Sequence, residues 1–345
     1  MNRKSLLLLA PVTFTAALLA GERVASSAIT IQTVPVGNVG NAADTDGYGS
    51  VNYAYDIGEY DVTASQYAAF LNAVAQTDPF GVYNSLGVYP SVMTGTTDGN
   101  PGIVQNGSAG SYTYSVAAGR GNYPVTDVSF WDACRFANWL DNGQPTGPEG
   151  VGTTETGSYS LTSNDIYNNT VTRNAGATWA VASEDEWHKA AYYSPNLNEG
   201  SGGYWQYPTQ SNTISTTQAN YNDVVGDTTA VGSYPYPSYY GTYDQGGDAF
   251  QWNETIIDDG LNRGLQGGNW YSNANVLQSD DYTVDDGGPS AIDSGIGFRV
   301  VEVPEPVSVG ILVLVLSGML FRRPGSGRNR LPGLSSLVRG RVGAC

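Results

Sequence analysis

The fold is decided late in the chain, by the segment Gly247-Asp248-Ala249-Phe250-Gln251-Trp252. Its glycine permits backbone conformations closed to other residues, and its tryptophan supplies a large apolar surface. The same combination returns in Gly267-Gly268-Asn269-Trp270, and Gly297-Phe298-Arg299 adds another large ring. Arg299 is one of few cations in an acidic chain, so we expect it to pair with a carboxylate. The three segments predict close backbone approaches beside buried aromatic side chains.

Three helices are predicted upstream of these segments. The first runs from Thr63 to about Gln76, with apolar residues at helical spacing along one face. The second begins near Ser129 and carries several large apolar residues. The third starts at Ser183, whose hydroxyl forms a capping box with Glu186.

Two chemically reactive side chains lie on these helices. Cys134 is surrounded by apolar residues in the second helix, which predicts a buried and unreactive thiol. His188 is the only histidine of the chain and lies in the third helix. We expect it to be a surface or hydrogen-bonded residue, because one histidine cannot build a histidine-rich metal site.

The rest of the chain is rich in turn-forming residues. It contains 44 glycines and 24 tyrosines, and long regular segments are few. We interpret residues 95–110 and 141–157 as surface loops. Short strands are predicted at residues 230–234, 246–252, 264–270 and 295–301. The expected fold class is therefore α+β, irregular and loop-rich, with few helices and short strands.

Read in order, eight short motifs resemble the formylglycine-generating enzyme family, also called the sulfatase-modifying factor domain. They include residues 57–72, 123–140, 183–191, 230–233, 240–244, 247–252, 267–270 and 297–299. Each motif is weak alone, but their common order gives the resemblance its weight. It implies one domain over residues 29–302, with an irregular fold related to that of the C-type lectins.

One departure from the family pattern concerns its chemistry. Active members carry two cysteines between the Gly-Gly-x-Trp and Gly-Phe-Arg motifs, where they bind copper and oxidise a substrate cysteine. Here residues 271–282 contain no cysteine, and Cys134 lies far away in sequence. Serine and asparagine neither bind copper(I) strongly nor carry electrons. We therefore expect neither copper nor catalysis; formylglycine-generating oxidase activity is the alternative.

The resemblance also implies calcium. In the family, a loop of the type Gly-Asn-x-x-Glu-Trp binds this ion; here Asp248 and Gln251 have exchanged the carboxylate and the amide. Calcium accepts both types of oxygen. A second family site falls near Asn220 and Asp223. These four residues are the candidate metal ligands; the other reading is that hydrogen bonds alone hold the loops.

The two ends of the chain predict export. Residues 1–28 have a basic start, a short apolar run and small residues at the end, which is typical of a cleavable signal peptide. Residues 303–345 contain Pro304-Glu305-Pro306, an apolar segment at 307–321 and then Arg322-Arg323. This tail resembles the PEP-CTERM signal that exosortase-type enzymes process, and it implies at least transient membrane insertion.

The negative charge of the domain limits the classes of molecule that it can bind. The formal net charge is −17, and only six of the 15 Lys and Arg residues lie between residues 29 and 321, against all but one of the 32 acids. Such a field repels nucleic acid. Residues 234–240 carry four tyrosines that suit a glycan or a protein partner, or that pack at the periphery of the fold. The expected function is a non-catalytic binding or structural module at the cell surface or in the extracellular matrix.

Overall fold

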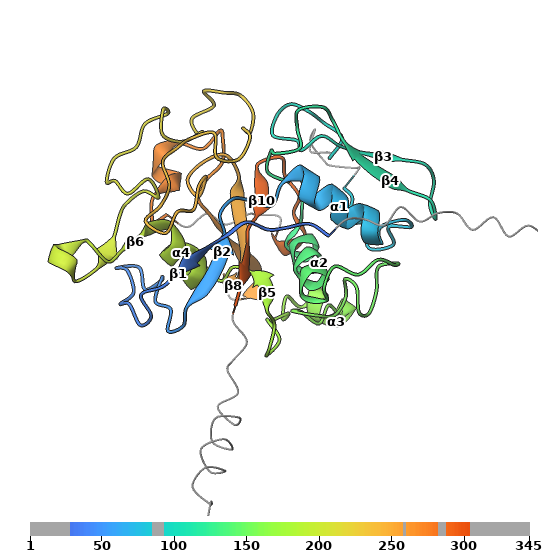
Figure 1. Ribbon diagram of the computed structural model, residues 1–345, viewed down its shortest axis with the longest axis horizontal. Helices are drawn as coiled ribbons and strands as arrows, with labels where there is room; N and C mark the ends of the chain where they lie inside the picture. The colour runs from blue at the N-terminus through green and yellow to red at the C-terminus, as the bar shows by residue number, and fades with distance from the viewer. Residues whose placement is uncertain (1–27, 85–92, 258–259, 282–287, 304–345) are drawn as a thin grey trace, which may run out of the picture. The chain divides into compact units, whose positions relative to one another are not determined.

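Capping interactions fix the start of each long helix. Figure 1 shows the computed structural model, which describes residues 28–84, 93–257, 260–281 and 288–303. Helix α1 spans Ala64–Val74, α2 spans Phe130–Asp141 and α4 spans Glu184–Tyr192. Each has a reciprocal capping box, and the one expected at Ser183 is confirmed, with its hydroxyl oxygen 3.2 Å from the Glu186 amide nitrogen. A short helix, α3, covers Ser163–Tyr167.

Short strands form two small sheets. The first has four antiparallel strands in the order β1 (Thr33–Val36), β2 (Tyr55–Gly58), β11 (Val300–Glu302) and β5 (Trp179–Val181). The second places β8 (Phe250–Ile257) between β10 (Ile296–Phe298), to which it is parallel, and β9 (Asn262–Gln266), to which it is antiparallel. The β2–β11 pairing joins the two ends of the domain, and Figure 1 shows α1 and α2 on one side of the central strands and α4 on the other.

Two hairpins and three single-turn helices complete the described structure. The hairpins pair β3 (Ile103–Asn106) with β4 (Thr113–Val116), and β6 (Tyr193–Ser194) with β7 (Gly203–Tyr204). The 3-10 helices are η1 (Asn198–Gly200), η3 (Ala274–Leu277) and η4 (Gly288–Ser290). Few helices, short strands and long irregular connections confirm the expected fold class.

The predicted strand boundaries need correction. Residues 230–234 form a turn instead of a strand, because Gly232 has a φ of 74° and its amide donates to Asp244. The strand expected at 264–270 ends at Gln266, because Gly267 and Gly268 have φ values of 92° and 72°. The segment 295–301 is two strands in different sheets, with Arg299 between them.

The hydrophobic core forms where the two helices α1 and α2 meet the sheets. Phe136 of α2 packs against Phe70 of α1 and against Phe298 of β10, with ring centroids 5.5 Å and 5.4 Å apart. Cys134 is fully buried in the same core, and this burial raises the pKa of its thiol well above its usual value. The expectation of an unreactive structural thiol agrees with this environment.

Arg299 is fully buried and joins three segments of the chain. It donates hydrogen bonds to the carbonyl oxygens of Gly58 and Tyr243, at 2.6 Å and 2.7 Å, and to Asp61 Oδ2 at 3.3 Å. The expected carboxylate partner of Arg299 is thus Asp61, which is itself buried. The rigid, planar geometry of the guanidinium group allows one side chain to satisfy several acceptors at once.

The two predicted end segments cannot be compared with this structure. Residues 1–27 of the signal peptide and residues 304–345 of the sorting tail lie outside the described residues. Within the part that is described, no helix combines the length and the apolar character that crossing a membrane requires.

Candidate functional site

A tight turn before β8 positions Asp248. Gly247 has a φ of 81°, and a Cβ atom there would collide with the carbonyl group of Asn220. The Asp248 amide donates to that carbonyl at 2.8 Å, so two distant segments lie against each other. The first quoted segment therefore does need its glycine, and the reason is this close approach.

The Asp248 carboxylate is buried and only half satisfied. Its Oδ1 accepts from Asn220 Nδ2 at 2.7 Å, from the Thr229 amide at 2.8 Å and from the Thr229 hydroxyl at 3.1 Å. Its Oδ2 has no hydrogen-bond partner among the described residues, and neither has Asn220 Oδ1. Two buried oxygen atoms on neighbouring side chains thus remain available, and hard cations such as calcium bind oxygen ligands of these types.

Electrostatics also favour a cation at Asp248. Burial raises the pKa of this carboxyl well above its usual value, and the nearby Asp244 carboxylate raises it further. Burial likewise raises the pKa of Asp244, to about 6. A positive ion would lower both pKa values by offsetting the loss of solvation and the mutual repulsion.

The other two candidate ligands lie in different settings. Gln251 is fully buried, and its Oε1 accepts from Trp187 Nε1 at 2.6 Å and from Arg299 Nε at 3.1 Å. Asp223 is exposed, and its amide donates to the carbonyl of Trp270, whose own amide donates to Asp248. The structure thus brings Asn220 and Asp248 together, while the Gln251 oxygen is already hydrogen-bonded to Trp187 and Arg299 in the core.

Scaffold residues occupy the stretch where active family members have their cysteine pair. Ser272 forms reciprocal hydrogen bonds with Asn269, including its hydroxyl to Asn269 Oδ1 at 2.8 Å. Leu277 is fully buried in a small cluster with Tyr207 and Tyr221. Of residues 271–281, which the structure describes, none offers a thiolate for copper.

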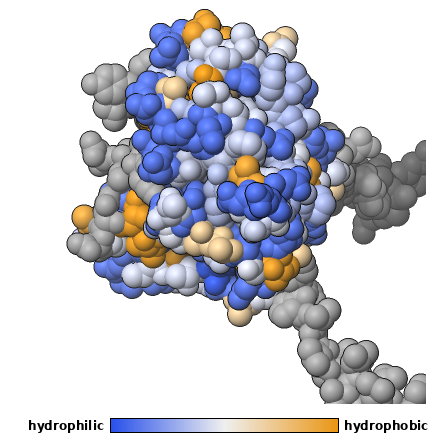
Figure 2. Space-filling view, turned by 90° about the vertical axis from the view of Figure 1, so that its left-hand side faces the viewer, coloured by the Kyte–Doolittle hydropathy of each residue, from blue (hydrophilic) through white to orange (hydrophobic). Residues whose placement is uncertain are grey.

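A polar groove opens on another part of the domain. It has a volume of about 660 Å³ and lies between the loop of residues 38–45 and the β6–β7 hairpin. The side chains at its wall include Asn38, Asn41, Asn198 and Tyr204. Figure 2 shows the side of the molecule that carries η1 and this hairpin in Figure 1, and its surface is mainly hydrophilic with small scattered apolar patches.

The tyrosine-rich loop of residues 234–240 connects to this groove. The Tyr240 hydroxyl donates to Asn38 Oδ1 at 2.9 Å, and the Tyr239 and Tyr240 rings are in edge contact. Tyr236 and Tyr239 remain exposed at 42% and 38%. Tyr240 thus contacts an amide of the groove wall and has the exposed ring of Tyr239 beside it. Tyr236 instead lines a separate small pocket with Pro208 and Gln218.

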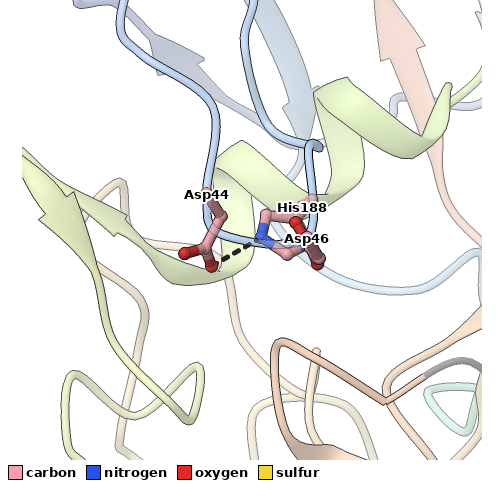
Figure 3. Close-up of side chains that lie close together, drawn as sticks. All are labelled: Asp44, Asp46 and His188. Carbon is pink, nitrogen blue, oxygen red and sulfur yellow. Dashed lines mark hydrogen bonds and ion pairs between the residues drawn. The ribbon is translucent and has the colours of Figure 1, made fainter.

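The groove wall also contains Asp44, which sequence reasoning missed. Asp44 accepts a hydrogen bond from His188, as Figure 3 shows, and Asp46 lies beside the same imidazole. His188 is hydrogen-bonded, as one of its two expected settings had it, but it is fully buried. The signal in the sequence was the run Asp44-Thr45-Asp46-Gly47-Tyr48-Gly49, with two acids and two glycines in six residues.

The irregular, loop-rich domain, with a glycine turn before a strand that carries a buried tryptophan, is consistent with a formylglycine-generating-enzyme-like fold. The model of the sulfatase-modifying factor enzyme 1-like domain matches residues 25–303, so the chain belongs to this family. No curated protein sequence matches it.

Several solved structures resemble the domain, and they include the following three. Treponema denticola variable protein 1 has a TM-score of 0.53 at 18% identity, over 81% of this chain and 97% of its own. CarF has a TM-score of 0.49 at 21% identity, over 80% and 99% of the two chains. PvdO from Pseudomonas aeruginosa has a TM-score of 0.45 at 18% identity, over 80% and 92%. At this identity the first of these supports the fold alone.

Proposed function

We propose that this chain is an exported protein of the cell surface or extracellular matrix that uses its family fold as a non-catalytic binding module. One observation carries the proposal: residues 271–282 contain no cysteine, so the copper chemistry implied by the family resemblance has no ligands there. The alternative function is formylglycine-generating oxidase activity, which is supported only by membership of the family.

Export and anchoring are part of the same proposal. The N-terminal signal segment directs the chain out of the cytoplasm, and an exosortase-type enzyme processes the tail after its apolar segment has entered the membrane. Mass spectrometry of the protein from its native host tests this step. An intact C-terminus through Cys345 would refute processing, whereas a shortened chain with an attached lipid or glycan supports it.

The ligand we propose is a glycan, bound by the groove and the adjoining tyrosine loop. Sugar hydroxyls suit amide and carboxylate partners such as Asn38, Asn198 and Asp44, and sugar faces suit an exposed ring such as that of Tyr239. Nucleic acid is an unsuitable ligand, because the acidic domain repels phosphate.

A glycan array with the full chain tests the binding function. Binding to a defined set of sugars supports the proposal, and Tyr239→Ala, beside the Tyr240 that bonds the groove wall, should weaken it about tenfold. Tyr167→Ala is the matched control, because this tyrosine is 89% exposed in α3 and lies outside the groove. Absence of binding to any glycan would leave a purely structural role and overturn this part of the proposal.

Calcium at Asn220 and Asp248 is the proposed cofactor. The two unpartnered buried oxygens support it, and the remaining ligands come from backbone carbonyls or water. Asp223 and Gln251 complete the candidate set implied by the family resemblance. Unchanged thermal stability on chelation would remove the site.

A further inference from the structure

The loop of residues 41–51 packs against helix α4. Asn41 Nδ2 donates to the Gly49 carbonyl at 2.6 Å, and the Gly40 amide donates to Val51 at 2.9 Å, which closes the loop at its base. Gly49 has a φ of 83°, and a Cβ atom there would lie 2.9 Å from the His188 ring. The backbone therefore covers the imidazole directly, and a larger residue at position 49 would displace it.

In each aspartate of the loop, one carboxylate oxygen accepts a backbone hydrogen bond and the other faces His188. Asp44 Oδ1 accepts from the Thr45 amide at 2.7 Å, and Asp46 Oδ1 accepts from the Tyr48 amide at 3.0 Å. The second oxygen of each faces His188: Asp44 Oδ2 is 3.2 Å from Nε2, and Asp46 Oδ2 is 4.0 Å from Nδ1. Figure 3 shows the imidazole between the two carboxylates.

One nitrogen of this ring lacks a partner. The His188 side chain is fully buried, and neither its Nδ1 nor the facing Asp46 Oδ2 has a hydrogen-bond partner among the described residues. A separation of 4.0 Å is too long for a hydrogen bond between them. When Nε2 donates to Asp44, a neutral imidazole has its lone pair on Nδ1, and a buried lone pair facing a carboxylate oxygen is unfavourable unless a proton or a metal ion lies between them; at 4.0 Å a proton on Nδ1 makes no hydrogen bond to Asp46.

A metal ion satisfies both atoms at this spacing. Zinc binds histidine nitrogen and carboxylate oxygen at about 2.1 Å, so two ligands are about 3.4 Å apart at a tetrahedral angle and about 4.2 Å apart when opposite. The observed 4.0 Å between Nδ1 and Oδ2 lies within that range.

The other ring nitrogen of His188, Nε2, makes the kind of contact that is common in metal-binding histidines. Such histidines donate their second ring N–H to a carboxylate, which fixes the tautomer and the ring orientation. Asp44 is in that position at Nε2. Burial acts to raise the pKa of Asp44, but the hydrogen bonds from His188 and Thr45 outweigh it and leave the pKa below its usual value.

The surroundings are negative and open to the groove. Among the described residues, neither Asp44 nor Asp46 forms an ion pair with Lys or Arg, and Asp185 adds a carboxylate that accepts from the Gly49 amide. The Asp44 and Asp46 side chains are 14% and 13% exposed. Asp44 also lines the groove.

We propose that His188 Nδ1 and Asp46 Oδ2 bind a divalent metal ion of the first transition row, best matched by zinc, while Asp44 holds the imidazole in place. Water or a groove-bound ligand completes the coordination. The site is separate from the oxygen ligands at Asn220 and Asp248, and it does not depend on whether the groove binds glycans.

The single histidine gives a direct test. The full chain, purified with a histidine-free tag and labelled with nitrogen-15 in the imidazole ring, is titrated with zinc chloride in excess calcium. We expect the Nδ1 resonance to shift and to saturate near one equivalent of zinc, while Nε2 keeps its proton. Unchanged ring resonances at excess zinc would overturn the proposal.

Variants separate this site from general binding to an acidic surface. Asp46→Asn keeps the side-chain size and should weaken zinc binding at least tenfold in calorimetry. Glu199→Gln is the matched control, since this exposed acid lies in η1 beside the groove, and it should change affinity less than twofold. Equal losses in both variants would contradict the assignment, and the ring titration of the unmodified chain gives an answer even if Asp46→Asn folds poorly.

Discussion

Replacing Arg299 with methionine should destabilise the domain by an amount that depends on pH. In the native chain, burial raises the pKa of Asp61 to about 7, although the Arg299 guanidinium acts to lower it. Above this pKa the pair is ionised, and removing one partner of a buried ion pair costs about 3–5 kcal/mol. We therefore expect a loss of this size for Arg299→Met at pH 8.

The loss should be smaller in acid. Because the folded-state pKa of Asp61 lies above its unfolded value near 3.8, the folded chain holds an extra proton between these pH values. At pH 5 Asp61 is already protonated, so Arg299→Met leaves no buried charge at that position. Native Asp61 is ionised only over the one pH unit between its pKa of about 7 and pH 8, and each such unit corresponds to about 1.4 kcal/mol. The loss of stability at pH 5 should therefore be about 1.4 kcal/mol smaller than the loss at pH 8.

Urea unfolding followed by tryptophan fluorescence at pH 5 and pH 8 measures both values. Arg120→Met serves as the control: its partner Asp227 is 22% exposed, so water can replace the lost contact and the loss should be smaller. A loss below about 1 kcal/mol at pH 8, or equal losses at the two pH values, would refute the role given to the Arg299–Asp61 pair.

Three further predictions concern the turn at Asp248 and the buried thiol. Calcium should raise the melting temperature of the native chain but not that of Asp248→Asn; the variant should also be the more stable chain at pH 8 without calcium, because the raised pKa of Asp248 means that the native chain loses stability as pH rises above about 4. Thermal unfolding with calcium or chelator measures both effects, and a variant that still responds to calcium would exclude Asp248 as a ligand. Gly247→Ala should cost about 3 kcal/mol or more, because its Cβ would strike the Asn220 carbonyl at a φ of 81°, whereas Gly143→Ala, at a φ of 79° with open space around it, should cost only about 1 kcal/mol. Cys134 should resist alkylation in the native chain and react in urea, as peptide mass spectrometry can measure; rapid native labelling would contradict its burial.

Local sequence signals were sufficient for the three long helices and for the buried thiol, whereas the five-residue helix α3 was not predicted. The capping box of Ser183 and Glu186 depends on residues three positions apart, and the buried Cys134 depends on neighbours within one helix. Strand ends were harder to predict, since the turn at Gly267 and Gly268 ends β9 by backbone conformation alone.

The candidate sites could be predicted only in part, because they depend on contacts between distant segments. The glycine of the motif predicted a close backbone approach, which Gly247 makes to Asn220, but the strand predicted over residues 246–252 begins only at Phe250. The unpartnered oxygen of Asn220 appears only when the two segments meet. The same holds for His188: its ring is enclosed by a loop that begins nearly 150 residues earlier, and no local pattern around the helix indicates that.

An oxidation assay distinguishes a non-catalytic module from a formylglycine-generating oxidase. The full chain is incubated with copper(I), oxygen and a cysteine-containing sulfatase peptide, beside an active formylglycine-generating enzyme, and the peptide is analysed by mass spectrometry. A non-catalytic module predicts a peptide that keeps its thiol. Repeated conversion of that cysteine to the aldehyde would contradict it.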